Sequence, residues 1–160
     1  MKLHYQTVSP ILIDYLHKLM AHPAFKDFYL VGGTSLALQR GHRLSIDIDL
    51  FTCIPYGQMN TAEIEAALIE MFPYTDRIEE LHYSQMVYSL YIGDNKEDCI
   101  KLDLCYDDAL IFPLIEVGGF RLASEKEIAA MKIQAITQKE QRRKDFWDIH
   151  ELLESYTLSE

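Results

Sequence analysis

Two aspartates separated by a single residue, Asp47 and Asp49, lie in an apolar run at residues 44–51 that is typical of a β-strand. Side chains alternate between the two faces of a strand, so both carboxylates are expected on one face. The apolar residues of the run are expected on the other face: Ile46, Ile48 and Leu50. Two like charges about 4 Å apart repel by roughly 4 kcal/mol at an effective dielectric constant near 20. A divalent cation removes this repulsion, so the pair indicates a metal site.

A Gly-Gly-Thr-Ser turn, Gly32 to Ser35, follows a short apolar strand at residues 28–31 and precedes the acidic run. Glycines let a backbone approach phosphate groups closely, and the start of a helix offers free N–H groups to an anion. Thr34 or Ser35 is expected to cap that helix. A double glycine after a strand is more often only a tight turn. The short distance to the acidic pair favours a nucleotide-binding loop.

A third carboxylate belongs to another expected strand, residues 100–106, in which Lys101, Asp103 and Cys105 share one face. Taken alone, Asp103 is most simply a solvent-facing strand residue. If the two strands are neighbours, however, Asp103 meets the acidic pair. Three carboxylates can hold two magnesium ions about 3.5 to 4 Å apart, one activating an attacking oxygen and one carrying a triphosphate.

Three further charged residues are candidates for the nucleotide pocket. Lys132 interrupts the apolar stripe of a helix that a capping box, Ser124 to Glu127, should start. Lys132 either extends to solvent or reaches a phosphate, and a methionine there should keep stability level or higher while lowering triphosphate affinity. Asp145, at the start of the last helix, either joins the pocket or only complements the helix dipole. Arg43 either contacts phosphate or forms a surface ion pair.

Composition limits the class of protein. The chain has 160 residues, of which 49% are hydrophobic, and we expect a single domain over residues 1–160. Three cysteines without a CxxC pair argue against a disulfide framework and a thiolate zinc site. Without a signal peptide or a membrane-spanning run, a cytoplasmic location is expected, with no membrane partner.

The formal net charge of −10 opposes general nucleic-acid binding. Residues 121–145, however, carry seven Lys or Arg against four Asp or Glu. This basic segment is either a solvated helix face or a landing site for a polyphosphate or an RNA.

The remaining patterns predict an α+β domain with one mixed sheet covered by helices. Expected helices cover residues 11–20, 60–72 and 124–138, and further strands cover residues 86–92 and 100–106. A last helix should place four apolar residues at core spacing, with Trp147 also packed inside: Phe146, Ile149, Leu152 and Leu153.

The blocks VGGTSLAL (residues 31–38) and GHRLSIDIDLF (residues 41–51) resemble the signature of the AbiEii/AbiGii-type nucleotidyltransferases, a branch of the DNA polymerase β-like superfamily. Shorter blocks at residues 101–103, 130–132 and 144–149 are similar to the later motifs of this family and come in the expected order. The resemblance spans roughly residues 28–153.

This resemblance implies a polymerase β-like fold and assigns roles to individual residues. Gly32, Gly33 and Thr34 would contact the nucleotide, with Ser35 and Arg43 beside them. Asp47, Asp49 and Asp103 would be the catalytic carboxylates and bind two Mg²⁺ ions together with the NTP. Lys132 and Asp145 would complete the pocket. Family members include toxins of toxin-antitoxin and abortive-infection systems, some of which add nucleotides to the 3′ ends of tRNA.

The leading hypothesis is therefore a metal-dependent nucleotidyltransferase that moves a nucleoside monophosphate from an NTP to an acceptor hydroxyl. The acceptor could be tRNA, another RNA, a protein or a small molecule, and a toxin role would imply a cognate antitoxin. Two alternatives stay open: a catalytically silent nucleotide-binding regulatory module, and an acidic protein-interaction module whose carboxylates are only solvated.

Overall fold

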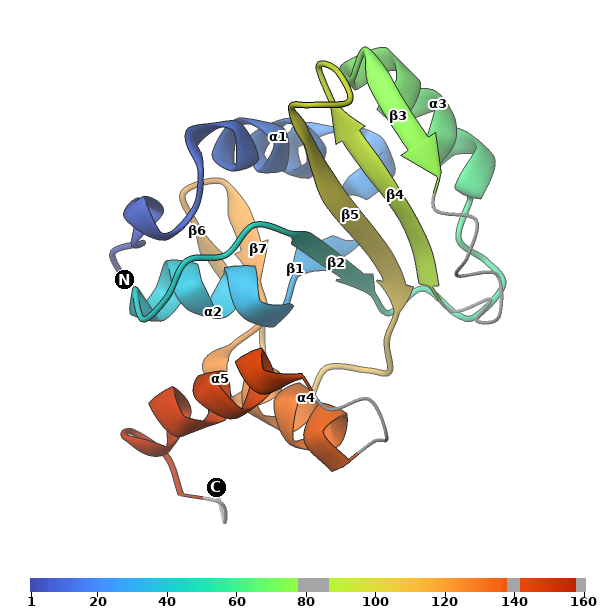
Figure 1. Ribbon diagram of the computed structural model, residues 1–160. Coiled ribbons are helices and arrows are strands. Elements are labelled where there is room, and N and C mark those ends of the chain that lie inside the picture. The colour runs from blue at the N-terminus through green and yellow to red at the C-terminus, as the bar shows by residue number, and fades with distance from the viewer. Residues whose placement is uncertain (78–86, 138–141, 158–160) are drawn as a thin grey trace.

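The structure is a computed structural model that describes residues 1–77, 87–137 and 142–157 (Figure 1). Within these residues one seven-stranded sheet has the order β3-β4-β5-β2-β1-β7-β6. Its strands are β1 (Phe28–Leu30), β2 (Ile48–Thr52), β3 (Tyr74–Arg77), β4 (Val87–Gly93), β5 (Cys99–Tyr106), β6 (Ile115–Val117) and β7 (Phe120–Leu122). The α-helices are α1 (Pro10–Ala21), α2 (Gly32–Arg40), α3 (Thr61–Met71), α4 (Glu125–Thr137) and α5 (Arg143–Leu153). Two short 3-10 helices precede β1, η1 (Tyr5–Thr7) and η2 (Pro23–Phe25).

The sheet is mixed, which confirms the α+β expectation. Strand β2 pairs parallel with β5 and antiparallel with β1, while β1 pairs parallel with β7. The register of the central pair places Asp49 directly beside Asp103. The expected convergence of these two carboxylates therefore follows from the pairing of β2 with β5.

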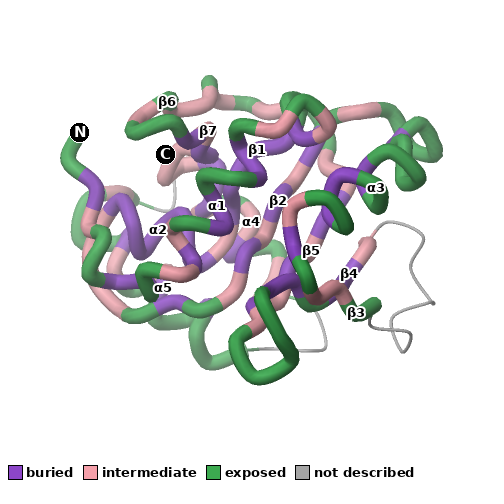
Figure 2. The backbone as a smooth tube through the Cα atoms, turned by 90° about the horizontal axis from the view of Figure 1, so that it is seen from above, coloured by how far each residue is buried: buried purple, intermediate pink, exposed green. Residues whose placement is uncertain are grey.

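Two layers of apolar side chains fix which face of the sheet carries the aspartates. Helices α1 and α3 contribute to a large core that includes Ile48 and Leu50 of β2 and Leu102 and Leu104 of β5. Because side chains alternate, Asp49 and Asp103 face the other side. A smaller apolar cluster on α2, α4 and α5 includes Leu36, Ile128 and Leu152. Figure 2 shows this alternation of buried and partly buried positions along β2 and β5.

Side-chain caps explain where three helices begin. The Ser9 hydroxyl accepts from the backbone N–H of Leu12 at 3.2 Å, and Asn60 accepts from that of Glu63 at 3.2 Å. Ser124 accepts from the N–H of Glu127 at 3.2 Å, as a capping box requires. The Glu127 carboxylate does not complete the box, because it accepts instead from the backbone N–H groups of Ile111 and Phe112 at 3.2 and 3.0 Å.

The acidic strand is shorter than expected. Strand β2 begins at Ile48, and the preceding residues Leu44 and Ile46 are 73% and 66% exposed instead of facing the core. The backbone of this segment is held from outside the sheet, because the N–H of Ser45 donates to the carbonyl of Thr7 at 2.9 Å. Asp47 therefore lies on a loop just before the strand.

The last helix differs from the amphipathic expectation. Phe146, Trp147 and Leu153 are 46%, 63% and 47% exposed, so the prediction that they pack in the core is wrong. Its buried face carries Asp145 and Asp148 together with Leu152. Polar partners inside the protein, described below, stabilise this arrangement.

Three short strands were missed, β3, β6 and β7, because runs of three or four residues carry too little periodicity to be recognised. Two predicted boundaries, the start of a strand at Met86 and the end of a helix at Gln138, lie outside the described residues.

Arg121 on β7 ties the N-terminal segments to the sheet. Its guanidinium donates to the backbone carbonyls of Phe28 at 2.8 Å, Phe25 at 2.8 Å and Met20 at 3.1 Å. We expect Arg121→Met to lower the free energy of unfolding by about 3 kcal/mol, because three carbonyls lose a charged donor. Urea denaturation measures this change. Lys2→Met, at an exposed position, should stay within about 0.5 kcal/mol of the native protein, and an equal effect of both variants would contradict the role of Arg121.

Candidate active site

A cavity of about 580 Å³ brings most of the sequence-predicted site residues together. Seven of the ten line it: Gly32, Gly33, Arg43, Asp47, Asp49, Lys132 and Asp145. These residues come from the start of α2, the loop before β2, β2 itself, α4 and the start of α5 (Figure 1). The other lining residues include Val31, Phe51, Met131 and Ala135, so one part of the cavity is apolar and another is charged.

Asp49 lies against the glycine turn. A Cβ atom on Gly32 would come within 2.5 Å of Asp49 Oδ2, and Gly32 has a φ of 68°. Both the backbone conformation and the close approach therefore require glycine at this position. Burial raises the pKa of Asp49 to about 6, and the charges of Asp103 and Asp47 act in the same direction. A cation bound beside Asp49 would relieve both effects.

Asp103 is held by two neighbours. Ser89 on β4 donates from Oγ to Asp103 Oδ1 at 2.5 Å, and the Lys101 ammonium contacts Oδ2 at 2.6 Å. Within residues 1–77, 87–137 and 142–157, no three His, Cys, Asp or Glu side chains lie close enough together to hold one ion. The donor set still fits magnesium in its chemistry, because Asp49 and Asp103 supply carboxylate oxygens on one face of adjacent strands. Burial, together with the charges of Asp103 and Asp47, raises the pKa of Asp49.

The absence of a side chain at Gly33 makes room for the Arg43 guanidinium. A Cβ atom on Gly33 would overlap with Nη2 of Arg43, so the guanidinium packs directly on the turn. Thr34 and Ser35 are buried and do not cap the helix, which begins at Gly32. The Thr34 hydroxyl lies 2.5 Å from the carbonyl oxygen of Asp47 and 2.8 Å from Ser45 Oγ. Thr34 thereby fixes the loop that carries Asp47.

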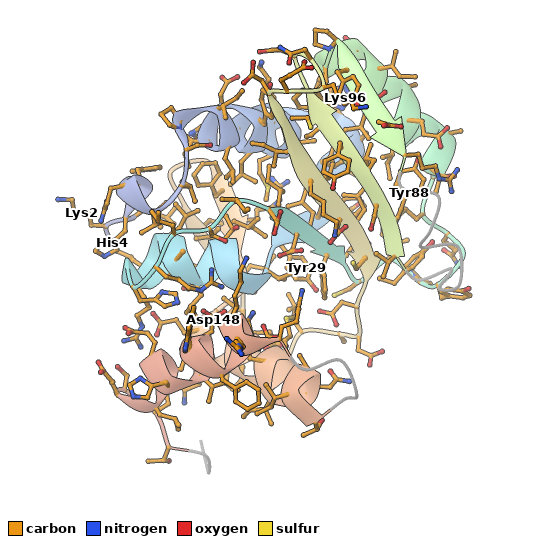
Figure 3. All side chains as sticks on the ribbon, in the orientation of Figure 1. Lys2, His4, Tyr29, Tyr88, Lys96 and Asp148 are labelled. Atoms are coloured by element: carbon orange, nitrogen blue, oxygen red, sulfur yellow. The ribbon has the colours of Figure 1, made fainter. Side chains whose placement is uncertain are left out.

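Asp148, a residue of α5 with no solvent exposure, is the common partner of three basic side chains near the cavity. It accepts from Arg43 Nε at 2.6 Å and Nη2 at 2.8 Å, from His42 Nε2 at 2.9 Å, and pairs with Lys132 Nζ at 2.9 Å. Burial opposes ionisation of Asp148, but the hydrogen bonds from Arg43 and His42 and the charge of Lys132 lower its pKa well below the usual range. Figure 3 labels Asp148 between α2 and the C-terminal helices.

Lys132 is buried rather than extended to solvent. Besides Asp148 it contacts Asp145 Oδ1 at 2.5 Å, and Asp145 is itself only 2% exposed. Arg142 Nε lies 3.2 Å from the other Asp145 oxygen. Lys132 and Asp145 thus form one ion-pair network at the cavity wall, and neither an outward-pointing lysine nor a purely dipole-stabilising aspartate describes them.

The basic segment divides into two parts. Arg142, Arg143 and Lys144 are exposed and line the cavity. Arg121 and Lys132 are used inside the fold, and Lys126 lies over the rings of Phe112 and Tyr156. Lys139 lies outside the described residues. The exposed cations at the cavity therefore come from the start of α5, whereas Arg43 and Lys132, which also line it, are paired with aspartates.

Asp148, Ser89 and Lys101 contact predicted site residues but had been given no role from the sequence. The pattern had placed Lys101 on the face of Asp103 without predicting their ion pair. Asp148 carried a signal, because it lies three residues after Asp145 and four before Leu152, at a position where a helix normally buries an apolar side chain. Ser89 carried no signal, since only the pairing of β4 with β5 brings it opposite Asp103.

The pKa of Asp49 predicts a pH dependence of metal binding. A proton and a metal ion compete for Asp49, so Mn²⁺ affinity should fall about tenfold for each pH unit below about 6. Titration calorimetry between pH 5 and 7.5 measures this, and Asp49→Asn should bind Mn²⁺ weakly at every pH, with no transition near pH 6. An affinity that does not change over this range would contradict the raised pKa.

The same shift has a defined effect on the stability of the metal-free protein. The folded pKa of about 6 lies above the ordinary value of 3.8. The contribution of Asp49 to stability is therefore fully present below pH 4 and is lost as the pH rises through 6.

Comparison with known proteins identifies relatives of this chain. Residues 14–160 match the family model described as nucleotidyl transferase AbiEii toxin, type IV toxin-antitoxin system. The protein aq_aa25 of Aquifex aeolicus (strain VF5) is 30% identical over 147 residues, covering 88% of this chain and 65% of its own length. The chain thus spans just under two thirds of this relative.

Solved structures share the fold. JHP933 from Helicobacter pylori superposes with a TM-score of 0.62 at 23% identity, over 91% of this chain and 64% of its own. The Megavirus polyadenylate synthase superposes with a TM-score of 0.58 at 15% identity, over 91% of this chain and 30% of its own. These similarities confirm the expected polymerase β-like nucleotidyltransferase fold. Among the helices of the described residues, none has the length and apolar character needed to span a membrane.

Proposed function

The chain belongs to the AbiEii nucleotidyl transferase toxin family, and from this premise we propose that it transfers a nucleoside monophosphate from an NTP to an acceptor hydroxyl, releasing pyrophosphate. One observation carries the proposal: the two glycines at the start of α2, the loop carrying Asp47, the half-buried Asp49 and the Lys132–Asp145 pair all line one cavity. Its volume of about 580 Å³ lies in the range of small-ligand sites.

The triphosphate would lie at the start of α2. Gly32 and Gly33 leave the backbone bare there, and a helix N-terminus attracts phosphate through its free N–H groups and its dipole. Thr34 and Ser35 act in this proposal by positioning the loop, since their side chains are buried. Arg43 packs on Gly33 and donates to Asp148, so it links the start of α2 to α5, and it adds positive charge at the cavity.

Asp47, Asp49 and Asp103 would hold Mg²⁺, with two ions expected when an NTP is bound. Magnesium there would neutralise charge on the phosphates and favour ionisation of the acceptor hydroxyl. Asp103 would accept the proton of that hydroxyl, and Lys132 and Asp145 would keep the pocket wall in place through their ion pair. Positioning and charge neutralisation would supply most of the rate acceleration.

We propose an RNA, such as tRNA, as the acceptor. The chain is acidic overall, yet three consecutive cations, Arg142, Arg143 and Lys144, lie at the cavity, where a phosphate-bearing acceptor would gain from them. The family further supports a toxin role, opposed by a cognate antitoxin protein.

The test is incubation of the protein with each labelled NTP, MgCl₂ and either total tRNA or the protein alone. We expect label on the RNA for at least one NTP, with loss of the label in the presence of EDTA. Binding of NTP without transfer to RNA or protein would favour the catalytically silent alternative. Absence of magnesium-dependent NTP binding would favour the acidic interaction module.

A further inference from the structure

Both oxygens of Asp103 have partners within the protein itself. Ser89 Oγ lies 2.5 Å from Oδ1, and Lys101 Nζ lies 2.6 Å from Oδ2. Ser89 is the cross-strand partner of Asp103 on β4, and Lys101 precedes Asp103 by two residues on β5, so all three share one face of the sheet. The carboxylate is thus oriented by a neutral hydroxyl and by a cation of the protein itself.

Lys101 interacts electrostatically with all three aspartates of the proposed metal site. Its electrostatic neighbours include Asp49 and Asp47 in addition to Asp103. Its side chain is 31% exposed and that of Asp103 is 17% exposed, so the ammonium sits at the edge of the site with a path to solvent. A lysine stem is flexible and can move its charge outward without moving the backbone.

We propose that Lys101 is a displaceable counter-cation of the acidic site: its ammonium holds Asp103 while no metal is bound, and a divalent ion that takes Asp103 as a ligand must displace it. This proposal rests on the metal-dependent function proposed above. An ammonium and a divalent cation on one carboxylate repel each other, and the divalent ion has the larger charge. The Ser89 hydroxyl is neutral and can keep its bond to Asp103 throughout.

The direction in which metal affinity changes when Lys101 is removed distinguishes competition with the metal from mere positioning of Asp103. If Lys101 only positioned Asp103 for the metal, its removal would weaken metal binding. If Lys101 competes with the metal, its removal strengthens binding. We expect Lys101→Met, which keeps an unbranched stem, to lower the dissociation constant for Mn²⁺ about three- to tenfold in the absence of nucleotide.

The measurement is a titration with Mn²⁺ followed by electron paramagnetic resonance, which detects the free ion. The matched control is Lys96→Met, which makes the same charge change in the exposed turn between β4 and β5 and at a residue that does not line the cavity. Figure 3 labels Lys96 well away from Asp148. We expect Lys96→Met and Lys101→Arg to bind within twofold of the native protein. Lys101→Gln should reproduce the gain and guards against a folding defect peculiar to methionine.

Binding by both Lys101→Met and Lys101→Gln that is no tighter than that of Lys96→Met overturns the counter-cation role. If the native protein meanwhile binds Mn²⁺ and transfers nucleotide, only the role of Lys101 fails. If the native protein and both lysine variants bind Mn²⁺ no better than an Asp47→Asn/Asp49→Asn double variant, the proposed metal-dependent function fails with it.

Discussion

Lys132→Met should destabilise the protein by about 3 kcal/mol, because it leaves two buried carboxylates, Asp145 and Asp148, without their shared ammonium. For a domain of this size the loss corresponds to a fall in Tm of roughly 6 to 12 °C. The loss is limited because Asp148 keeps Arg43 and His42, and Asp145 keeps Arg142. Differential scanning calorimetry measures the change.

Two comparisons test whether the ion pair is the cause. Lys18→Met removes a lysine whose pair with Asp14 is exposed, and such pairs contribute at most about 1 kcal/mol. The double variant Lys132→Met/Asp145→Asn should be less destabilised than the sum of the two single variants, since the second change removes one unpaired charge. A Tm of Lys132→Met at or above the native value would restore the interpretation from sequence, in which methionine suits an apolar helix stripe.

The sequence and the structure thus lead to opposite expectations for the stability of Lys132→Met, and the difference shows which contacts a sequence pattern cannot predict. The helix of Lys132 and its capping serine were predictable from local pattern, because both depend on neighbours within four residues. The ion-pair partners of Lys132 were not, since they lie 13 and 16 residues away on another helix. A lysine among apolar residues indicated burial or function, but the pattern could not name the buried aspartates that compensate its charge.

The same limit applies to the sheet. Period-two patterns predicted β4 and β5 and the side of β5 that carries Asp103. From the sequence, Asp103 was expected beside Asp49 only if their two strands were neighbours. The structure shows that β2 and β5 are indeed paired, in parallel. Strand β7, three residues long, pairs with β1 through a single register contact at Leu30 and Leu122, and no local pattern indicates such a partner.

The two glycines do not form a separate turn before the helix, as expected, but lie in the first turn of α2, and the reason expected for them was incomplete. Glycines were expected to admit phosphate. In the structure Gly32 also makes room for the Asp49 carboxylate, and Gly33 makes room for the Arg43 guanidinium. A side chain at either position would therefore disturb the protein's own charged groups before any ligand binds.

Asp49→Asn should abolish nucleotidyl transfer while leaving the fold intact. The change is nearly isosteric, so it removes the charge that would bind metal and little packing. A loss of about 4 kcal/mol in transition-state stabilisation corresponds to roughly a thousandfold fall in rate. Because burial and the charges of Asp103 and Asp47 raise the pKa of Asp49 to about 6, its charged form is unfavourable in the metal-free protein at neutral pH. The metal-free variant should therefore be at least as stable as the native protein.

The two effects must be measured together, because their opposite signs distinguish a catalytic carboxylate from a structural one. Mg²⁺ with NTP should raise the Tm of the native protein, by about 2.7 kcal/mol of added stability at a hundredfold excess over Kd, and should not raise that of Asp49→Asn. Asp14→Asn, at an exposed position on α1, serves as the control and should keep native transfer and the native Tm increase. Near-native transfer by Asp49→Asn would refute the metal assignment. A large loss of metal-free stability would instead make Asp49 a structural residue of the β2–α2 contact, whose loss of activity follows from unfolding.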